Sequence, residues 1–212
     1  MCGLIACHTL LRITQCRNEE KEKQHARLQV RCSVVLVLMV EFCVPAVAFS
    51  EPFTITSTAF KDGGLLTVRN AGALKTNPNC VGENVSPPLA WNDPPAGTKS
   101  FAFVLFDPDG RNGVGVYHWV AYGIPSDLRG FAEGEISQPS DKYVGGKNTA
   151  GLGSYFGPCS PAGTGLHHYN FTLIATDIDS KELEPGLTRD ALIEKLAGHA
   201  KGAATIVGLF ER

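Results

Sequence analysis

The stretch Ser100–Ile124 constrains the fold of this chain more than any other. It opens with an unbroken apolar run, Phe101–Phe106, which stops at an Asp-Pro-Asp-Gly tetrapeptide. A continuous run of Phe, Val and Leu is typical of a strand that is covered on both faces. The sequence therefore predicts a buried strand that carries two carboxylates, Asp107 and Asp109, at its end.

A second apolar run follows from Tyr117 and contains a histidine. Period-two alternation predicts that His118 shares one face with Val120, Tyr122 and Ile124, so that it points into the protein or into a cleft. Neither feature is specific alone, because Asp-Pro-Asp-Gly is usually a plain turn and a histidine in a strand is usually a packing residue.

A third element makes a functional reading stronger. A Gly- and Pro-rich loop, residues 157–166, delivers His167, His168 and Tyr169 to the start of another apolar strand, residues 170–176. Two acidic side chains, imidazoles and a phenol would then meet if the three segments converge in the fold.

These motifs resemble those of the phosphatidylethanolamine-binding protein family, also called Raf-kinase-inhibitor-like proteins. The resemblance rests on Asp-Pro-Asp followed by His118-Trp119-Val120, and on the loop that ends in His167-His168-Tyr169. Three further segments fit the same family, namely Gly82–Trp91, Gly146–Asn148 and Gly198–Gly208. The match is collinear from Phe53 to Arg212, and it looks most like the short bacterial branch.

The resemblance implies a mostly β fold, an antiparallel Greek-key-like β-sandwich with one main helix near the C-terminus. The residues agree, because 23 Gly and 13 Pro indicate many turns. Thr188 can cap a helix that runs to about Ala197, and Leu192 and Leu196 form its inward stripe. The segment Leu89–Trp91 lies between two Pro-Pro pairs, so we expect it to be extended and not central in a sheet.

The resemblance also implies a small cleft that binds a ligand. Its expected contacts are Asp107, Asp109, His118, His167 and Tyr169, with Gly157 and Pro158 shaping the wall. Phosphate oxygens accept hydrogen bonds, which imidazolium, phenol and backbone N–H groups can donate. The two carboxylates are expected to raise the imidazole pKa values and keep both rings cationic, so that binding weakens as pH rises.

We therefore expect non-catalytic binding of a small phosphate-bearing or anionic ligand, of the phospholipid-headgroup type, without a cofactor. Members of the family are associated with the inhibition of kinases or proteases, and the bacterial ones often look like homodimers. The chain departs from the family pattern at two positions. Ser160 stands where a Pro is usual. His168 stands where an Arg is common, which removes a fixed positive charge near the mouth of the cleft and is expected to weaken anion binding.

Two other chemistries use the same residues. Asp107, His118 and His167 could hold a metal in a metal-dependent hydrolase, although no His-x-x-x-His pair is present. Cys159 could be a nucleophile beside His167, or it could form a disulfide with Cys80 in an oxidising compartment.

The Gly-rich segment 145–153 has neither the Walker nor the Gly-x-Gly-x-x-Gly spacing, which argues against nucleotide binding.

The first 48 residues differ from the remainder. They hold five of the seven cysteines, a basic lead, a short apolar segment and a small-x-small exit, which together predict a signal peptide cleaved after Ala48. Residues 49–212 would then form one exported domain, periplasmic or secreted. A membrane anchor is the alternative, although the uncharged run is far shorter than the ~20 residues that a span needs. A lipidated Cys43 is a weaker alternative, because Glu41 and Phe42 are poor residues to precede a lipidated cysteine.

Charge argues against nucleic acid as a partner. The chain of 212 residues has a formal net charge of −2, and residues 49–212 hold 13 basic and 17 acidic side chains. A weakly acidic domain without a basic run is poorly suited to a phosphate backbone.

Overall fold

The structure of the protein is a computed structural model, which describes residues 51–212. The predicted signal peptide, its cleavage after Ala48 and the alternative anchors lie outside these described residues. Within residues 51–212, no helix combines the length and the apolar character that crossing a membrane requires.

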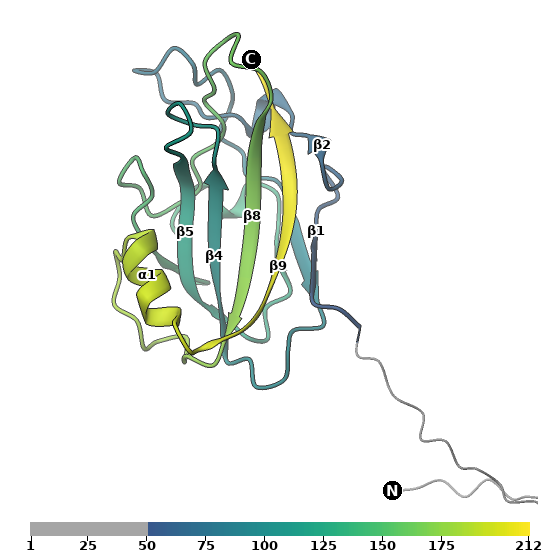
Figure 1. Cartoon of the computed structure of the whole chain (residues 1–212), viewed down its shortest axis with the longest axis vertical. Coiled ribbons are helices and arrows are strands. Elements are labelled where there is room, and N and C mark those ends of the chain that lie inside the picture. Colours follow the sequence, from purple (N-terminus) through teal and green to yellow (C-terminus); the bar gives the residue numbers. More distant parts are fainter. Residues whose placement is uncertain (1–50) are drawn as a thin grey trace, which may run out of the picture. The chain divides into compact units, whose positions relative to one another are not determined.

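The described residues form two β-sheets with helical segments beside them (Figure 1). The larger sheet has the order β2 (Gly64–Leu65), β9 (Ala200–Phe210), β8 (His167–Thr176), β4 (Ser100–Asp107), β5 (Val116–Pro125) and β7 (Val144–Gly145). The smaller sheet has the order β1 (Thr54–Thr56), β3 (Leu89–Asn92) and β6 (Gly130–Phe131). The helices in this part of the chain are α1 (Arg189–Leu196) and the short 3-10 helices η1 (Val68–Asn70) and η2 (Glu135–Ser137). The predicted mostly β sandwich with one main helix is confirmed, although β2 runs parallel to β9.

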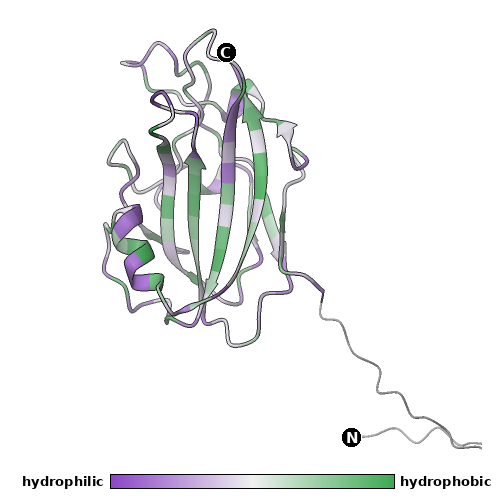
Figure 2. Cartoon of the chain, viewed as in Figure 1, coloured by the Kyte–Doolittle hydropathy of each residue, from purple (hydrophilic) through white to green (hydrophobic). Residues whose placement is uncertain are grey.

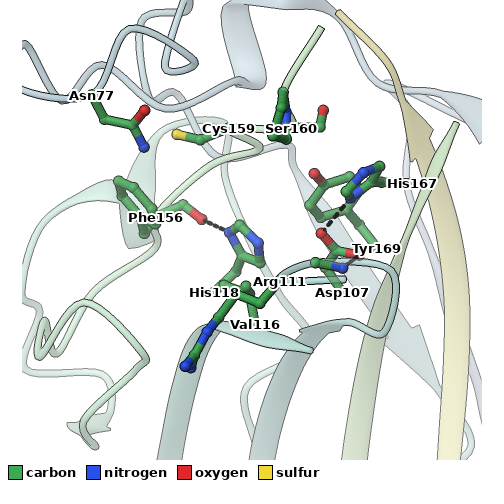
Figure 3. Close-up of a pocket in the computed structure, with 12 residues that line it drawn as sticks. Asn77, Asp107, Arg111, Val116, His118, Phe156, Cys159, Ser160, His167 and Tyr169 are labelled. Carbon is green, nitrogen blue, oxygen red and sulfur yellow. Dashed lines mark hydrogen bonds and ion pairs between the residues drawn. The ribbon is translucent and has the colours of Figure 1, made fainter. Parts of the chain in front are cut away.

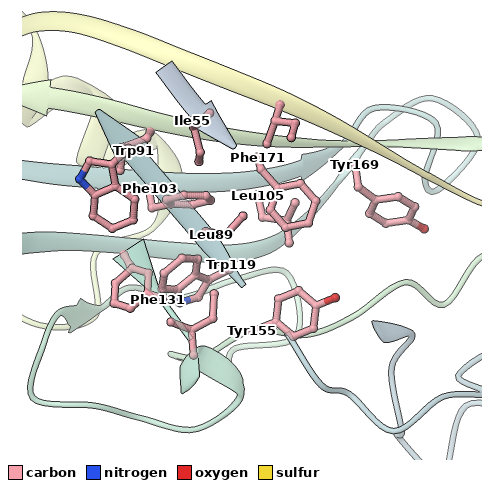
Figure 4. Close-up of a cluster of buried hydrophobic side chains, with 14 of the residues drawn as sticks. Ile55, Leu89, Trp91, Phe103, Leu105, Trp119, Phe131, Tyr155, Tyr169 and Phe171 are labelled. Carbon is pink, nitrogen blue, oxygen red and sulfur yellow. The ribbon is translucent and has the colours of Figure 1, made fainter. Parts of the chain in front are cut away.

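The main core lies between the two sheets (Figure 4). Phe103 and Trp119 pack with ring centroids 4.8 Å apart, and Trp91 meets Phe101 edge-on at 5.7 Å. These four side chains are fully buried. Burying an aromatic side chain of this size contributes about 1.5–3 kcal/mol, so this aromatic layer holds the sheets together.

The second core lies on the outer face of the larger sheet, under α1. Leu192 and Leu196 pack there against the outward side chains of β4 and β5, among them Tyr122. Thr188 caps the helix, because its hydroxyl accepts a hydrogen bond from the backbone N–H of Ala191 at 3.3 Å. Figure 2 shows the resulting polar and apolar sides of α1. The predicted helix is therefore confirmed, and β4 is buried on both faces as expected.

The segment around Trp91 differs from the prediction. β3 is the central strand of the smaller sheet, paired antiparallel with β1 on one side and β6 on the other. The Pro-Pro pairs at 87–88 and 94–95 flank the strand and do not interrupt it, so its N–H groups remain available for both neighbours.

The predicted alternation along β5 also differs from the structure. β5 carries an extra residue opposite β4 near Gly123, which has a φ of +62°. A bulge of one residue shifts the alternation, so Ile124 faces the intersheet core whereas Val120 and Tyr122 face α1.

Candidate functional site

A cavity of about 290 Å³ opens where β4 ends and where β5 and β8 begin (Figure 3). Its lining residues are Asn77, Asp107, Gly110, Arg111, Val116, His118, Phe156, Cys159, Ser160, Pro161, His167 and Tyr169. The structure therefore brings together four of the predicted ligand contacts, Asp107, His118, His167 and Tyr169.

Asp107 is a buried carboxylate whose two oxygens are both occupied. Oδ1 accepts hydrogen bonds from the backbone N–H groups of Asp109 and Gly110 at 2.9 and 3.0 Å. Oδ2 lies 2.8 Å from Nδ1 of His167. The Asp-Pro-Asp-Gly turn thus folds back on its own first side chain, and the carboxylate is fixed in place.

His167 links Asp107 to the loop that precedes β8. Its Nε2 lies 2.9 Å from the hydroxyl oxygen of Thr164, which also lies 2.8 Å from the carbonyl oxygen of Pro161. Thr164 has one hydroxyl hydrogen, so if it donates to Pro161 then Nε2 of His167 must donate to Thr164. All these contacts are satisfied together when His167 is an imidazolium paired with the Asp107 carboxylate.

His118 reaches the cavity because of a second bulge in β5. Leu105 pairs with Trp119 and Phe106 pairs with Tyr117, so His118 is the extra residue with no partner on β4. A bulge redirects the side chain of the extra residue. His118 therefore lies beside Tyr169 of the inner face, with ring centroids 5.1 Å apart, instead of following Val120 outward.

The ring of His118 is buried and its two nitrogens differ. Nδ1 lies 2.6 Å from the carbonyl oxygen of Phe156 and must donate to it, whereas Nε2 has no hydrogen-bond partner in residues 51–212. Figure 3 shows this second nitrogen on the side of Asp107 and His167. The pKa of His118 is lowered, mainly by burial. The hydrogen bond to the Phe156 carbonyl and the charge of Asp107 act to raise this pKa, but their effect is smaller than that of burial. The prediction of a cationic ring is therefore wrong for His118 in the protein without a ligand. The neutral ring directs the lone pair of Nε2 toward the cavity.

Two hydroxyls of the cavity wall, those of Ser160 and Tyr169, make no hydrogen bond of good geometry in the described part of the chain, although the Tyr169 hydroxyl lies near that of Ser160 and near the Asp107 carboxylate. The two residues are 3% and 0% exposed. Burial, with the nearby Asp107 carboxylate, raises the pKa of Tyr169, so the phenol keeps its proton and remains a donor. A buried hydroxyl without a partner costs about 1–3 kcal/mol, and such groups call for a ligand or water.

Three predicted contacts lie outside the cavity lining. Asp109 turns to the outer surface, where Oδ2 accepts from the backbone N–H of His168 at 2.8 Å and lies 2.9 Å from its Nδ1. The hydrogen bond from His168 lowers the pKa of Asp109. Gly157 and Pro158 are not lining residues, and Gly157 packs closely against the chain: its N–H donates to Oδ1 of Asn84, and a Cβ there would lie 2.1 Å from the carbonyl oxygen of Asn70.

Other residues of the lining were not predicted from the sequence. Asn77 comes from the loop after η1, and Arg111 and Phe156 come from the loops that flank β5 and precede β8. The sequence singles out Ser160 as a departure from the family pattern and as a poorly exposed hydroxyl, but it does not place Ser160 in the cavity. One feature of the sequence could have pointed to Asn77: it lies three residues before Cys80, which was expected to pair with Cys159.

Cys80 and Cys159 form a disulfide with a Cα–Cα distance of 4.4 Å across a sequence separation of 79 residues. Cys159 is therefore not a free nucleophile in this state. No group of three or more His, Cys, Asp or Glu side chains within residues 51–212 is arranged to hold a metal ion. Both nitrogens of His167 are also occupied, so the alternative of a metal-dependent hydrolase is not supported.

Comparison with known proteins gives the same fold and family. The family model "Phosphatidylethanolamine-binding protein" matches residues 56–211. A Mycobacterium tuberculosis protein named "Putative lipoprotein LppC" is 39% identical over 172 residues, which cover 81% of this chain and 78% of that one. A UPF0098 protein of Methanothermobacter thermautotrophicus is 38% identical over 143 residues, which cover 66% of this chain and 92% of that one.

A solved structure extends the comparison to three dimensions. The crystal structure of Escherichia coli YbcL, described as a new member of the mammalian PEBP family, superimposes with a TM-score of 0.67 at 29% identity. The superposition covers 76% of this chain and 98% of YbcL. The family match over nearly the whole described region, together with the relatives and the sandwich, means that the chain belongs to the phosphatidylethanolamine-binding protein family.

Proposed function

We propose that the protein binds a small phosphate-bearing or anionic ligand, of the phospholipid-headgroup type, in the cavity beside Asp107 and His118. The observation that carries this proposal is the pair of buried hydroxyls, Ser160 and Tyr169, that make no hydrogen bond of good geometry in the described residues. Both residues line the cavity. Their hydroxyl groups can donate hydrogen bonds, and a phosphate group carries several acceptor oxygens. A cavity of about 290 Å³ suits a headgroup and is too small for acyl chains.

The charges of the site support an anionic ligand despite the buried carboxylate. Asp107 accepts hydrogen bonds from two backbone N–H groups and contacts Nδ1 of His167, so both of its oxygens are engaged by the protein before a ligand binds. Nε2 of His118 can take up a proton when an anion binds beside it, because the negative charge favours the imidazolium and opposes the effect of burial on the pKa. Ligand binding and protonation of His118 would then be linked, and affinity would fall as pH rises.

A binding role without catalysis fits the same geometry. Ser160 is the cavity residue with a hydroxyl of the kind that serine hydrolases use as a nucleophile. No histidine in the described residues accepts a hydrogen bond from it. A serine without a base to take its proton is a weak nucleophile. Inhibition of a kinase or protease, and assembly into a homodimer, stay predictions from the family resemblance.

The test is calorimetric titration with glycerophosphoethanolamine, whose charge is constant between pH 5.5 and 8.5, and with inorganic phosphate. Tyr169→Phe should bind about 10–100-fold more weakly, because one hydrogen bond to a charged group is lost. Its thermal stability should not fall, since the substitution removes an unsatisfied buried hydroxyl. Tyr143→Phe is the matched control, because that hydroxyl donates to Gln138 away from the cavity.

Equal affinity of the Tyr169→Phe and wild-type proteins would reject the proposed contact. Equal wild-type affinity for glycerophosphoethanolamine at pH 5.5 and 8.5 would reject the link to His118. Binding of inorganic phosphate with no binding of glycerophosphoethanolamine would reject a headgroup as the ligand class.

We also propose that the domain is exported to an oxidising compartment or the cell envelope. The disulfide between Cys80 and Cys159 supports this, because such bonds persist outside the cytosol. The relative LppC is named a lipoprotein, which is in keeping with an envelope location. Mass spectrometry of the protein made in cells should find a mature N-terminus at residue 49 with Cys80 and Cys159 oxidised. An intact N-terminus with both thiols free would contradict export.

A further inference from the structure

The loop Ala73–Val81 passes beside the cavity, and few contacts hold it. Its internal hydrogen bonds are turns, from Asn77 N–H to Leu74 and from Cys80 N–H to Asn77. Within the described part of the chain, one hydrogen bond connects its side chains to another region, from Arg212 to Oδ1 of Asn79 at 3.0 Å. The other attachment is covalent, the disulfide to Cys159. The base of the loop is closed by a hydrogen bond from Gly82 N–H to the carbonyl oxygen of Gly72 at 2.9 Å, and beyond that base the disulfide is its main attachment to the cavity wall.

The disulfide lies next to the cavity and against a fixed piece of backbone. Cys159 itself lines the cavity, beside Ser160. A Cβ on Gly72 would lie 2.4 Å from Sγ of Cys159 and 3.5 Å from Sγ of Cys80, so the sulfurs pack directly on that glycine. Gly72 N–H in turn donates to the carbonyl of Pro158 at 2.8 Å. The bond thus joins the loop to the cavity wall at one defined place.

Asn77 is the residue that this attachment brings to the cavity. Cys80 ends the turn that Asn77 begins, three residues earlier. Oδ1 of Asn77 accepts a hydrogen bond from the backbone N–H of Asn79 at 3.0 Å, which leaves Nδ2 with its two hydrogens as a donor. Nδ2 has no hydrogen-bond partner in residues 51–212, and Figure 3 shows it on the cavity side of the amide.

We infer that Asn77 is a ligand-contacting residue that donates to an anionic oxygen, and that the Cys80–Cys159 disulfide is the positioning device that holds it there. This inference rests on the proposed function and adds a donor from outside the strands of the site. Its donor lies in a loop that lines the same cavity as Ser160 and Tyr169, so it would add a contact from the loop to those from the two hydroxyls.

The test uses calorimetric titration of the oxidised protein with inorganic phosphate and with glycerophosphoethanolamine. Asn77→Asp keeps the acceptor that forms the turn and replaces the donor with a second acceptor. It should therefore bind both probes at least 50-fold more weakly, and more weakly than Asn77→Ala at about 10-fold, since the carboxylate also repels the anion. If Asn77 served only to shape the loop, the order would be reversed.

Asn79→Asp is the matched control, because it makes the same change two residues away at a side chain that bonds Arg212. It should bind within about 2-fold of wild type, as an exposed charge has little effect at a distance. A double-mutant cycle tests the disulfide. Cys80→Ser/Cys159→Ser should weaken binding about 10-fold, and adding Asn77→Ala to it should weaken binding by less than about 2-fold further.

Each outcome bears on a separate claim. Wild-type protein that binds neither probe would overturn the proposed function and this inference with it. Wild-type binding with equal affinity in Asn77→Asp would overturn the inference alone. If the double serine variant does not fold, Asn77→Asp still decides whether Asn77 contacts the ligand, because it leaves the disulfide intact. Fully additive effects in the cycle would remove the positioning role of the disulfide. If Asn77→Asp loses binding of glycerophosphoethanolamine but binds inorganic phosphate as wild type does, Asn77 does not contact the anionic group that the two probes share.

Discussion

His167 and His168 are neighbours on β8, and each pairs with an aspartate from the same turn, yet the two pairs lie on opposite faces of the sheet. The inward pair joins Nδ1 of His167 to Asp107 at 2.8 Å, with side chains 5% and 4% exposed. The outward pair joins Nδ1 of His168 to Asp109 at 2.9 Å, with side chains 53% and 41% exposed. The distances are nearly equal, so water access is what separates the two pairs.

This difference teaches that equal geometry does not mean equal energy. Water can replace either partner of the outward pair, so its contribution to stability is small. The inward pair has no such replacement, and every donor and acceptor in it is matched by the protein, from the turn N–H groups through to Thr164. Only the inward pair can therefore set the electrostatics of a small cavity.

The largest expected effect comes from removing the inward carboxylate. Asp107→Ala leaves the imidazole of His167 and the N–H groups of Asp109 and Gly110 without an acceptor, so the free energy of unfolding should fall by about 3–5 kcal/mol. Asp109→Ala, the matched change on the outer face, should lower it by less than about 1 kcal/mol. Urea denaturation at pH 7 measures both.

Asp107→Asn separates the hydrogen bonds from the charge. The amide oxygen still accepts from the turn, and the amide NH₂ can donate to His167 if the ring changes its tautomer. This variant should recover a large part of the stability that Asp107→Ala loses. Equal losses in Asp107→Ala and Asp109→Ala would contradict the distinction between the two pairs.

The sequence predicted Asp107 at the end of a buried strand and the outer helix, because both follow from local patterns. That Asp107 and His167 lie at one cavity was expected only from the family resemblance. Asp107 ends an apolar strand, and Thr188 with the leucine stripe marks α1. His118 could not be placed in the same way, because its bulge exists only relative to β4. Asp109 was expected in the cavity, but the turn that bonds Asp107 carries the next carboxylate outward. The direction of a side chain after a turn depends on tertiary pairing, which spacing alone does not contain.

His118 extends the comparison of His167 with His168, because it is a buried histidine without a carboxylate partner. Its pKa in the folded protein is lowered from the usual value of 6.5, mainly by burial, so the unfolded chain binds a proton more readily. Its contribution to stability is complete above pH 6.5 and is lost as pH falls toward the folded pKa, by up to about 1.4 kcal/mol per pH unit. Urea denaturation between pH 7.5 and 5.5 should show this loss.

His118→Gln removes the titrating group while its amide can still donate to the Phe156 carbonyl. This variant should lose less stability than wild type when pH falls from 6.5 to 5.5, by at most about 1 kcal/mol. His168→Gln, on the outer face, should keep the wild-type pH dependence. Identical pH dependence in wild type and His118→Gln would show that burial does not govern the ionisation of His118.

The smallest expected effect concerns the position where the family commonly has an arginine. From the sequence, His168 in place of arginine was expected to weaken anion binding. The side chain lies on the outer face and does not line the cavity, so a charge there acts through solvent and is screened over about 8 Å at physiological salt. His168→Arg should change the affinity for inorganic phosphate by less than about 2-fold in calorimetric titrations. Arg111→Gln, which removes a cation that does line the cavity, should weaken binding by about 3–10-fold, as loss of a charged partner of a phosphate would. A gain of tenfold in His168→Arg would mean that the outer face shares the field of the cavity, and the contrast between the two histidine–aspartate pairs would then fail.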